Sequence, residues 1–226
     1  MKVAPKKAHQ NYKYTCATIG VSMGSPQHTG VIFENLVAWA SQNFKTCIID
    51  LSDTLHRHNL VSDATSMEQA YELSLAEGDA WLLAHQPIID RIGIPVQTIR
   101  WNHWLGHPDY NENLTLFQKA FAEQSIFRDA VMDDIMKYFN RKGLALNYLS
   151  PERIQNAINY LLEELAAHSI LYKEHPSITL YPGKQHNCYN LVREGLIKNV
   201  PTGLQQSEFT RMIVYNFDQQ SKTRIG

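Results

Sequence analysis

Apolar residues recur with two different spacings along the first half of the chain. Three short apolar runs rich in β-branched residues predict strands, over residues 15–23, 46–51 and 94–101. Two stretches with apolar residues at helical spacing predict helices, over residues 29–44 and 66–84. Because strands and helices alternate, the pattern favours a parallel sheet of Rossmann type.

The second half of the chain follows the helical period more closely. It predicts helices over residues 112–122, 125–140 and 150–168, and strands over 177–181 and 208–217. The last strand is expected near a sheet edge. A chain of 226 residues without a linker or repeat can bury one full core. We therefore expect a single α/β domain over residues 1–226, with a mainly parallel sheet flanked by helices and flexible tails at 1–13 and 218–226.

Composition indicates an ordinary globular protein. Hydrophobic residues make up 44% and charged residues 19%, and no apolar run reaches the roughly 18 residues of a membrane span. Cys16, Cys47 and Cys188 are scattered, which favours reduced thiols and hence a cytoplasmic protein. The basic, polar start has no secretory apolar segment. The net charge of −1 argues against a strongly cationic nucleic-acid binder.

Ser22 is the first candidate for chemistry, because it ends the first predicted strand between Gly20 and Gly24. Ligands of doubly wound sheets bind beyond the carboxyl ends of the strands, and an activated serine can attack a carbonyl. A small turn residue is the simpler interpretation. Residues 20–24 also match the G-x-S-x-G nucleophile elbow of serine hydrolases. Such an enzyme needs a histidine as its catalytic base, and the sequence context singles out none of the ten histidines for this role.

Tyr160 and Glu164 form a second candidate, on the helix predicted over residues 150–168. They are four residues apart and therefore share one helix face, whereas Glu163 should be solvated. A carboxylate beside a tyrosine can hold an ammonium group and accept its proton. For the pair alone, an amphipathic helix with an exposed glutamate and a packed tyrosine is the simpler interpretation. Tyr181 ends a later predicted strand.

Taken together, these segments resemble the cyclodipeptide synthases, which are small Rossmann-type enzymes similar to the catalytic domain of class Ic aminoacyl-tRNA synthetases. The family pattern is a strand ending in Gly-aliphatic-Ser and a helix carrying Tyr-aliphatic-x-x-Glu. Residues 20–22 and 160–164 match it. The family has a branch with a variable residue, a tyrosine and a proline at three further positions, matched here by Ser25, Tyr181 and Pro182. The resemblance runs from about residue 14 to 193.

The resemblance implies a transferase that joins two aminoacyl-tRNAs into a cyclic dipeptide, by ping-pong transfer through an aminoacyl ester on a serine, with no cofactor or metal. The catalytic residues it implies are Ser22, Tyr160, Glu164 and Tyr181, with Gly20, Ser25 and Pro182 around the site. By alignment, the pocket for the first side chain is lined by Thr18, Asp50, Asn102, Ala167 and Thr179. This polar lining implies a polar or cationic side chain, for example histidine. It is equally open that Asp50 caps a helix or points away.

The expected tRNA partner meets one difficulty. Members of the other branch carry a basic helix after the second strand, whereas residues 66–79 contain four acidic residues and no lysine or arginine. Phosphate binding depends on such cations. The candidates elsewhere are Lys119, Arg128, Lys137, Arg141 and Lys142, each of which a solvated helix face also explains. A non-catalytic tRNA or nucleotide binder is a third hypothesis, and the sequence leaves monomer or dimer open. The histidine spacings offer no third ligand and predict no metal site.

Overall fold

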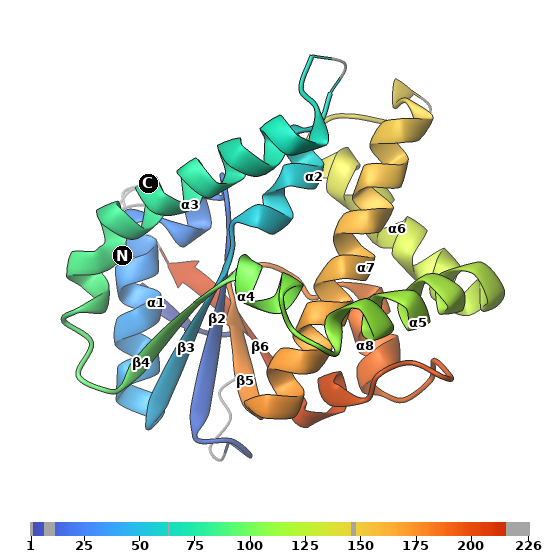
Figure 1. Ribbon diagram of the computed structural model, residues 1–226. Helices are drawn as coiled ribbons and strands as arrows, with labels where there is room; N and C mark the ends of the chain where they lie inside the picture. The colour runs from blue at the N-terminus through green and yellow to red at the C-terminus, as the bar shows by residue number, and fades with distance from the viewer. Residues whose placement is uncertain (1, 7–11, 63, 146–147, 216–226) are drawn as a thin grey trace, which may run out of the picture.

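A computed structural model describes residues 2–6, 12–62, 64–145 and 148–215. Its centre is a six-stranded sheet in the order β1-β6-β5-β2-β3-β4 (Figure 1). The strands are β1 (Lys2–Pro5), β2 (Cys16–Ser22), β3 (Thr46–Ser52), β4 (Val96–Arg100), β5 (Ser177–Tyr181) and β6 (Ser207–Tyr215). Only the β1–β6 pair is antiparallel among these strands. The prediction of a single α/β domain with a mainly parallel, Rossmann-type sheet is confirmed.

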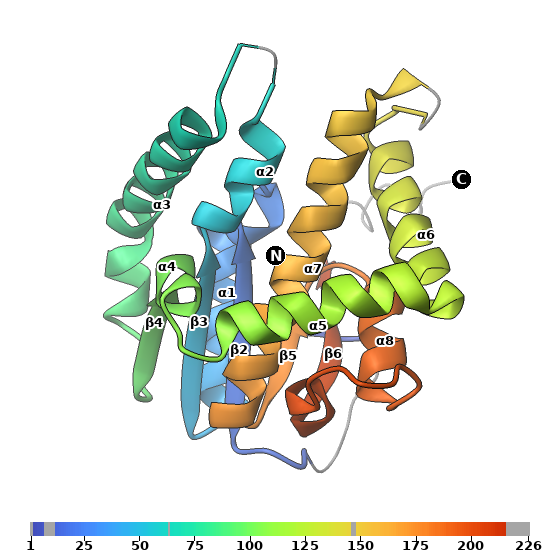
Figure 2. The same cartoon turned by 45° about the vertical axis from the view of Figure 1, so that its right-hand side comes forward.

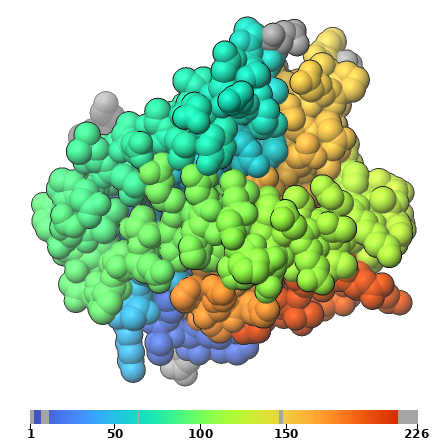
Figure 3. All heavy atoms as spheres, in the orientation of Figure 1, coloured from blue at the N-terminus to red at the C-terminus, as the bar shows by residue number. Residues whose placement is uncertain are grey.

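Helices cover both faces of the sheet (Figures 1 and 2). One face is covered by α1 (Gly30–Asn43) and α3 (Met67–Ile89). The other is covered by α4 (Trp101–Leu105), α5 (Tyr110–Glu123), α6 (Ser125–Arg141), α7 (Pro151–Glu174) and α8 (Asn187–Arg193). Short connections are made by η1 (Pro26–His28), η2 (Thr54–His56), α2 (Arg57–Leu60) and η4 (Gly203–Gln206). In the space-filling view, the residues from α3 through α5 cover most of the face turned to the viewer (Figure 3).

Strand alternation decides which residues reach the site. In β2, Ala17, Ile19 and Val21 are fully buried against the layer of α1 and α3. Successive side chains of a strand point to opposite faces, so Thr18, Gly20 and Ser22 face the layer that contains α7. The parallel register places Asp50 of β3 beside Gly20. This face is more polar than its opposite because it forms the floor of a cavity.

Most predicted elements are present, with shifted ends. The helix predicted over 66–84 begins with the capping box formed by Ser66 and Gln69 and continues through Pro87 to Ile89. Trp101, predicted as a strand residue, instead begins α4. The helix predicted over 150–168 continues to Glu174. The short helices α2, α4 and α8 were not predicted, since each spans fewer residues than helical periodicity needs to show itself.

The predicted N-terminal tail is wrong for part of its length. Residues 2–5 form β1, in which Val3 pairs with Val214 of β6 and is buried. A strand this short carries no periodic signal, and the backbone hydrogen bonds offered by β6 hold it in place. As a result, β6 lies one strand in from the sheet edge. Residues 1, 7–11 and 218–226 of the predicted tails lie outside the described residues.

Two further observations concern the chain as a whole. Among the described helices, none combines the length and the apolar character needed to span a membrane. The three cysteines are all free thiols, and Cys47 and Cys188 are buried.

Candidate active site

Ser22 is the last residue of β2, at the carboxyl edge of the sheet. Its hydroxyl oxygen lies 3.5 Å from the hydroxyl of Tyr181, which ends the neighbouring strand β5. Its backbone N–H donates a 2.9 Å hydrogen bond to Nδ1 of His28. His28 is in turn held by Trp81 of α3, whose indole N–H donates to the His28 carbonyl oxygen. The end of β2 is therefore fixed by the segment that leads into α1.

A cavity of about 70 Å³ opens beside Ser22. Its floor is the polar face of β2, β3 and β5, and its walls come from α7, α8 and the loop before α8. The lining includes Thr18, Gly20, Ser22, Asp50, Ser52, Glu164, His168, Tyr172, Thr179, Tyr181, Lys184, Gln185, His186, Tyr189, Arg193 and Phe209. Three of the four residues assigned to catalysis from the sequence, Ser22, Glu164 and Tyr181, thus share one cavity.

Tyr160 lies one turn before Glu164 on α7 and is not among the residues that line this cavity. Burial raises the pKa of the Tyr160 hydroxyl, and the nearby Glu164 carboxylate raises it further. Burial also raises the pKa of Tyr181, against a smaller lowering by its hydrogen bond with Ser22. Both phenols therefore stay protonated at neutral pH and can donate hydrogen bonds.

Asp50 does not cap a helix. One of its carboxylate oxygens accepts a 2.8 Å hydrogen bond from the indole N–H of Trp104, and the other lies 2.9 Å from Nε2 of His168. Burial alone would lower the pKa of His168, but the hydrogen bond and the charge of Asp50, with a smaller contribution from the Glu164 carboxylate, together outweigh burial and raise the pKa. Nδ1 of His168 lies 2.7 Å from the Tyr189 hydroxyl. The buried carboxylate is therefore a cavity wall with its partners already in place.

The other residues predicted to surround the substrate divide into two groups. Thr18 and Thr179 line the cavity, next to each other on β2 and β5. Asn102 and Ala167 are not among the residues that line this cavity. The Asn102 side chain lies in the first turn of α4 and accepts a 2.8 Å hydrogen bond from the Thr54 hydroxyl. Ala167 is fully buried in the helix layer.

Ser25 and Pro182, which the resemblance placed around the site, also lie outside the cavity lining. They follow the ends of β2 and β5. The backbone of Ser25 donates to the carbonyl of Ser22 and accepts from His28, so it shapes the turn rather than the cavity surface. Pro182 is buried directly after Tyr181.

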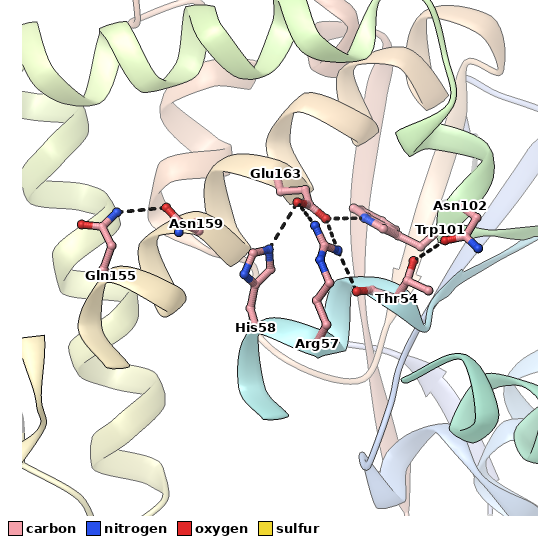
Figure 4. A network of polar contacts seen from close by, with 8 residues as sticks. All are labelled: Thr54, Arg57, His58, Trp101, Asn102, Gln155, Asn159 and Glu163. Atoms are coloured by element: carbon pink, nitrogen blue, oxygen red, sulfur yellow. Dashed lines mark hydrogen bonds and ion pairs between the residues drawn. The ribbon is translucent and has the colours of Figure 1, made fainter. Parts of the chain in front are cut away.

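Glu163 was predicted to be solvated and is instead buried, with 4% of its surface exposed. Arg57 of α2 donates two hydrogen bonds to it, of 2.8 and 2.6 Å, and Trp101 and His58 contact the same carboxylate (Figure 4). Burial alone would raise the pKa of Glu163, but the hydrogen bonds and the charges of His58 and Arg57 together outweigh burial and lower the pKa to about 2. Helical spacing cannot reveal a partner that comes from another element, which is why the prediction failed.

Several cavity residues were missed from the sequence, and α7 carried a signal for two of them. His168 and Tyr172 follow Tyr160 and Glu164 at intervals of four residues, so all four share one helix face. The polar stripe they form extends the Tyr160–Glu164 pair. Tyr189 and Arg193 are also four residues apart, but they lie on α8, which is too short to be recognised by periodicity.

The serine hydrolase alternative is not favoured by this geometry. A nucleophile elbow is a sharp, strained turn, whereas β2 stays extended through Ser22, and Asn199 is the only non-glycine residue with positive φ in the described ranges. His28 contacts the Ser22 backbone N–H and not its hydroxyl. Burial lowers the pKa of His28 to about 4.

The cations considered for tRNA binding lie along α5 and α6 and are exposed. Several already have local partners. Lys137 forms an ion pair with Asp133, Arg128 donates to a backbone carbonyl, and Lys142 lies over the ring of Tyr138. Arg141 ends α6 and is close enough to the cavity to lower the pKa of Tyr181, although burial raises that pKa more. Lys119 lies on α5 and has no such link to the cavity.

Nothing in the described ranges brings three or more His, Cys, Asp or Glu side chains together in a way that would hold a metal ion.

Comparisons with known proteins place these features in context. The family model described as cyclodipeptide synthase matches residues 9–169. A cyclodipeptide synthase structure from Fluoribacter dumoffii is 21% identical, with a TM-score of 0.77, covering 93% of this chain and 97% of that one. One from Bacillus thermoamylovorans is 16% identical, with a TM-score of 0.70 and coverages of 89% and 90%. A search of curated protein sequences gave no match.

The fold also extends to aminoacyl-tRNA synthetases. A tyrosyl-tRNA synthetase from Archaeoglobus fulgidus is 11% identical, with a TM-score of 0.54, and the match covers 91% of this chain but 56% of that one. The sheet and its helix layers thus resemble the fold of this synthetase.

Proposed function

This chain belongs to the cyclodipeptide synthase family, and on that premise we propose that it joins two aminoacyl groups, delivered as aminoacyl-tRNAs, by ping-pong transfer through an ester on Ser22. The observation that carries the proposal is the shared cavity, in which the Ser22 hydroxyl, the Tyr181 hydroxyl and the Glu164 carboxylate lie together. They match a nucleophile, a hydrogen-bond donor and a site for an ammonium group.

In the first step, the Ser22 oxygen attacks the carbonyl carbon of the first aminoacyl ester. A new ester bond forms, the bond to the terminal ribose oxygen of tRNA breaks, and the serine proton passes to that oxygen. Tyr181, 3.5 Å from the Ser22 oxygen, is positioned to relay this proton. Glu164 binds the ammonium group of the substrate. Because the substrate is already an activated ester, positioning supplies much of the rate.

In the second step, Glu164 accepts a proton from the bound ammonium group, and the free amine attacks the ester of the second aminoacyl-tRNA. A peptide bond forms, the bond between the second aminoacyl group and the ribose oxygen of its tRNA breaks, and the proton that the amine loses passes to that oxygen as the tRNA leaves. The new terminal amine then attacks the Ser22 ester, which closes the ring and returns the proton to the serine oxygen. These steps consume no cofactor. Tyr160, one turn from Glu164, orients the carboxylate.

The first side chain is proposed to be polar, because Thr18, Asp50 and Thr179 contribute polar atoms to the cavity. The sequence alone also allowed a cationic side chain such as that of histidine, on account of Asp50. In the structure the Asp50 carboxylate is paired with His168, whose pKa is raised. The cavity therefore holds a balanced pair at this point rather than a free negative charge.

The test is mass spectrometry of medium from bacteria that express the chain, beside a Ser22→Ala variant. We expect cyclic dipeptides from the original chain and at least about a 100-fold loss in the variant, because the nucleophile is removed. A Ser41→Ala variant is the matched control, since Ser41 lies on α1 and its hydroxyl contacts only a backbone carbonyl of that helix. Equal cyclic dipeptide yields with and without the Ser22 hydroxyl would refute the mechanism.

A further inference from the structure

Arg193, the last residue of α8, brings a guanidinium group to the cavity wall. Its Nε donates a 3.2 Å hydrogen bond to the Ser207 hydroxyl, and its Nη1 donates a 2.7 Å hydrogen bond to Oε1 of Gln185. Both acceptors are neutral. Within the part of the chain that the structure describes, no carboxylate lies within 4.0 Å of this guanidinium.

This arrangement differs from that of other arginines with buried partners. Arg57 has Glu163 and Arg100 has Asp53, each at 2.6 Å. Burying a charge is costly unless an opposite charge compensates it. Burial lowers the pKa of Arg193, while Tyr172 and Tyr189 and, more weakly, Glu194 and Glu208 act in the opposite direction. Neither glutamate forms an ion pair with Arg193. The positive charge of the Arg193 guanidinium is therefore available to a ligand in the cavity.

The other charged groups of the cavity are already balanced. Asp50 pairs with His168 at 2.9 Å, and His186 lies 3.8 Å from Asp134. Under the proposed function, Glu164 is matched by the ammonium group of the substrate. Arg193, together with the exposed Lys184, then leaves the cavity with an excess of positive charge when the amino group is bound.

The position of Arg193 suits a side chain rather than the reacting ester. Arg193 is tied to Ser207, which pairs with Ser177 at the start of β5, whereas Tyr181 at the end of β5 contacts Ser22. Arg193 thus approaches from the opposite end of the cavity from the nucleophile. The volume of this cavity, about 70 Å³, is smaller than the ~150 Å³ of a cavity that holds benzene. The cavity is therefore too small for a nucleotide but can admit a short side chain.

We infer that this cavity binds the side-chain carboxylate of an aspartyl or glutamyl substrate, with Arg193 as its partner. The inference rests on the proposed function for the position of the ester and the amino group. A guanidinium has five N–H donors in a planar fork, and two of those of Arg193 are used, so others remain for a carboxylate. Ser207 and Gln185 hold the fork in place before the substrate arrives.

The decisive experiment is calorimetric titration of the Ser22→Ala protein, which cannot be acylated, with the α-ethyl ester of L-glutamate. The α-ethyl ester of L-glutamine is the matched control, because it replaces only the side-chain carboxylate by an amide. The aspartate and asparagine esters form a second pair. Since a charge-assisted hydrogen bond outweighs a neutral one, we expect at least tenfold tighter binding of one acidic ester than of its amide. In an added Arg193→Met variant this ratio should fall to about one, and Arg193→Lys should restore part of it.

Three outcomes overturn the inference. The first is equal affinity for the acidic ester and its amide in both pairs. The second is a preference for the acidic ester that persists in an Arg193→Met protein with an unchanged unfolding temperature. The third is Arg193-dependent binding of inorganic phosphate without a preference for the acidic esters. Products separate this failure from that of the proposed function. Ser22-dependent cyclic dipeptides without an acidic residue overturn the inference alone. Absence of any Ser22-dependent product overturns the proposed function, while the titration still decides the inference.

Discussion

Two adjacent glutamates on α7 have opposite environments. Glu163 is buried against Arg57, His58 and Trp101, whereas Glu164 is half-buried and faces the cavity. A helix turns about 100° per residue, so neighbours cannot share a face. The result is a structural carboxylate next to one that is free for a substrate.

This contrast gives a paired prediction. Glu163→Gln should lower the free energy of unfolding by about 3 kcal/mol, because it leaves Arg57 buried without its counter-charge. Glu164→Gln should leave the unfolding temperature nearly unchanged and lower cyclic dipeptide formation at least about 100-fold, since no proton acceptor remains. Denaturant titration and product quantification on both proteins test this. The prediction is wrong if the two variants show the same change in unfolding free energy and the same change in cyclic dipeptide formation.

Sequence reasoning worked at the residue scale where a motif fixed the residue. Ser22, Glu164 and Tyr181 were singled out by type and order, and the structure brings them into one cavity. Reasoning failed where the outcome depended on a partner from another element. Arg57 and His58 on α2 lie more than a hundred residues before Glu163, and no local pattern links them.

At the element scale, the connection from β2 to α1 is held by a histidine cluster. Nδ1 of His28 accepts from Ser22, Trp81 donates to the carbonyl of His28, and Nε2 of His85 accepts from the first residue of α1, Gly30. Trp81 and His85 also stack with ring centroids 4.3 Å apart. Since α3 supplies two members of this cluster, the long helix fixes the end of the nucleophile strand.

The buried His28 makes stability depend on pH. Burial lowers its pKa from 6.5 to about 4, so between these values the unfolded chain binds a proton that the folded one refuses. The free energy of unfolding should therefore fall as pH drops from 6.5 to 4, by an amount on the order of 3 kcal/mol from this group. Denaturant titrations at pH 7, 6, 5 and 4.5 measure this loss.

A His28→Gln variant supplies the control. In this variant the free energy of unfolding should fall less between pH 6.5 and 4. Part of the fall should remain, because burial also lowers the pKa of His56. Glu163 does not interfere above pH 4.5, because its stabilising effect is lost only as pH falls from 4.5 towards 2. If the free energy of unfolding of His28→Gln depends on pH as steeply as that of the original chain, His28 is not the cause of the loss.

Elements were predictable from the sequence in proportion to their length. The helices α1, α5, α6 and α7 and the strands β2, β3 and β5 follow periodic patterns and lie where expected. The strand β1 and the helix α8 are short, and long-range pairing or packing fixes them instead of a local pattern. Failure to predict α8 affected the predicted site, because α8 supplies Tyr189 and Arg193.

At the scale of the whole molecule, charge is distributed unevenly. The outer face of α3 carries exposed Glu68, Glu72 and Asp79 and no cation between residues 66 and 79. The C-terminal end of α6 points to the same side of the molecule as the carboxyl ends of β2 and β3 (Figures 1 and 2). The first-turn Arg128 and the last residue Arg141 of α6 are about 20 Å apart along the helix, so they cannot form one small patch.

The proposed tRNA partner therefore predicts an effect of the Arg141 end. Arg141→Glu combined with Lys142→Glu should lower the rate at least tenfold at low salt and weaken its salt dependence, because fewer phosphates are neutralised. Lys45→Glu is the matched control, since Lys45 is exposed directly before β3, at the opposite edge of the sheet. Rates at 50 and 200 mM salt decide the outcome. Equal losses in both proteins would point to net charge instead of a docking surface.

The hydrogen bond from the Ser22 N–H to His28 has a consequence for redesign. When a carbonyl is attacked at Ser22, a negative oxyanion develops, and many serine enzymes meet it with main-chain N–H groups. Here the N–H of Ser22 already donates a 2.9 Å hydrogen bond to His28, and the Tyr181 hydroxyl lies 3.5 Å from the serine oxygen. An engineer who wished to turn this scaffold into an esterase would have to free that amide first, by replacing His28.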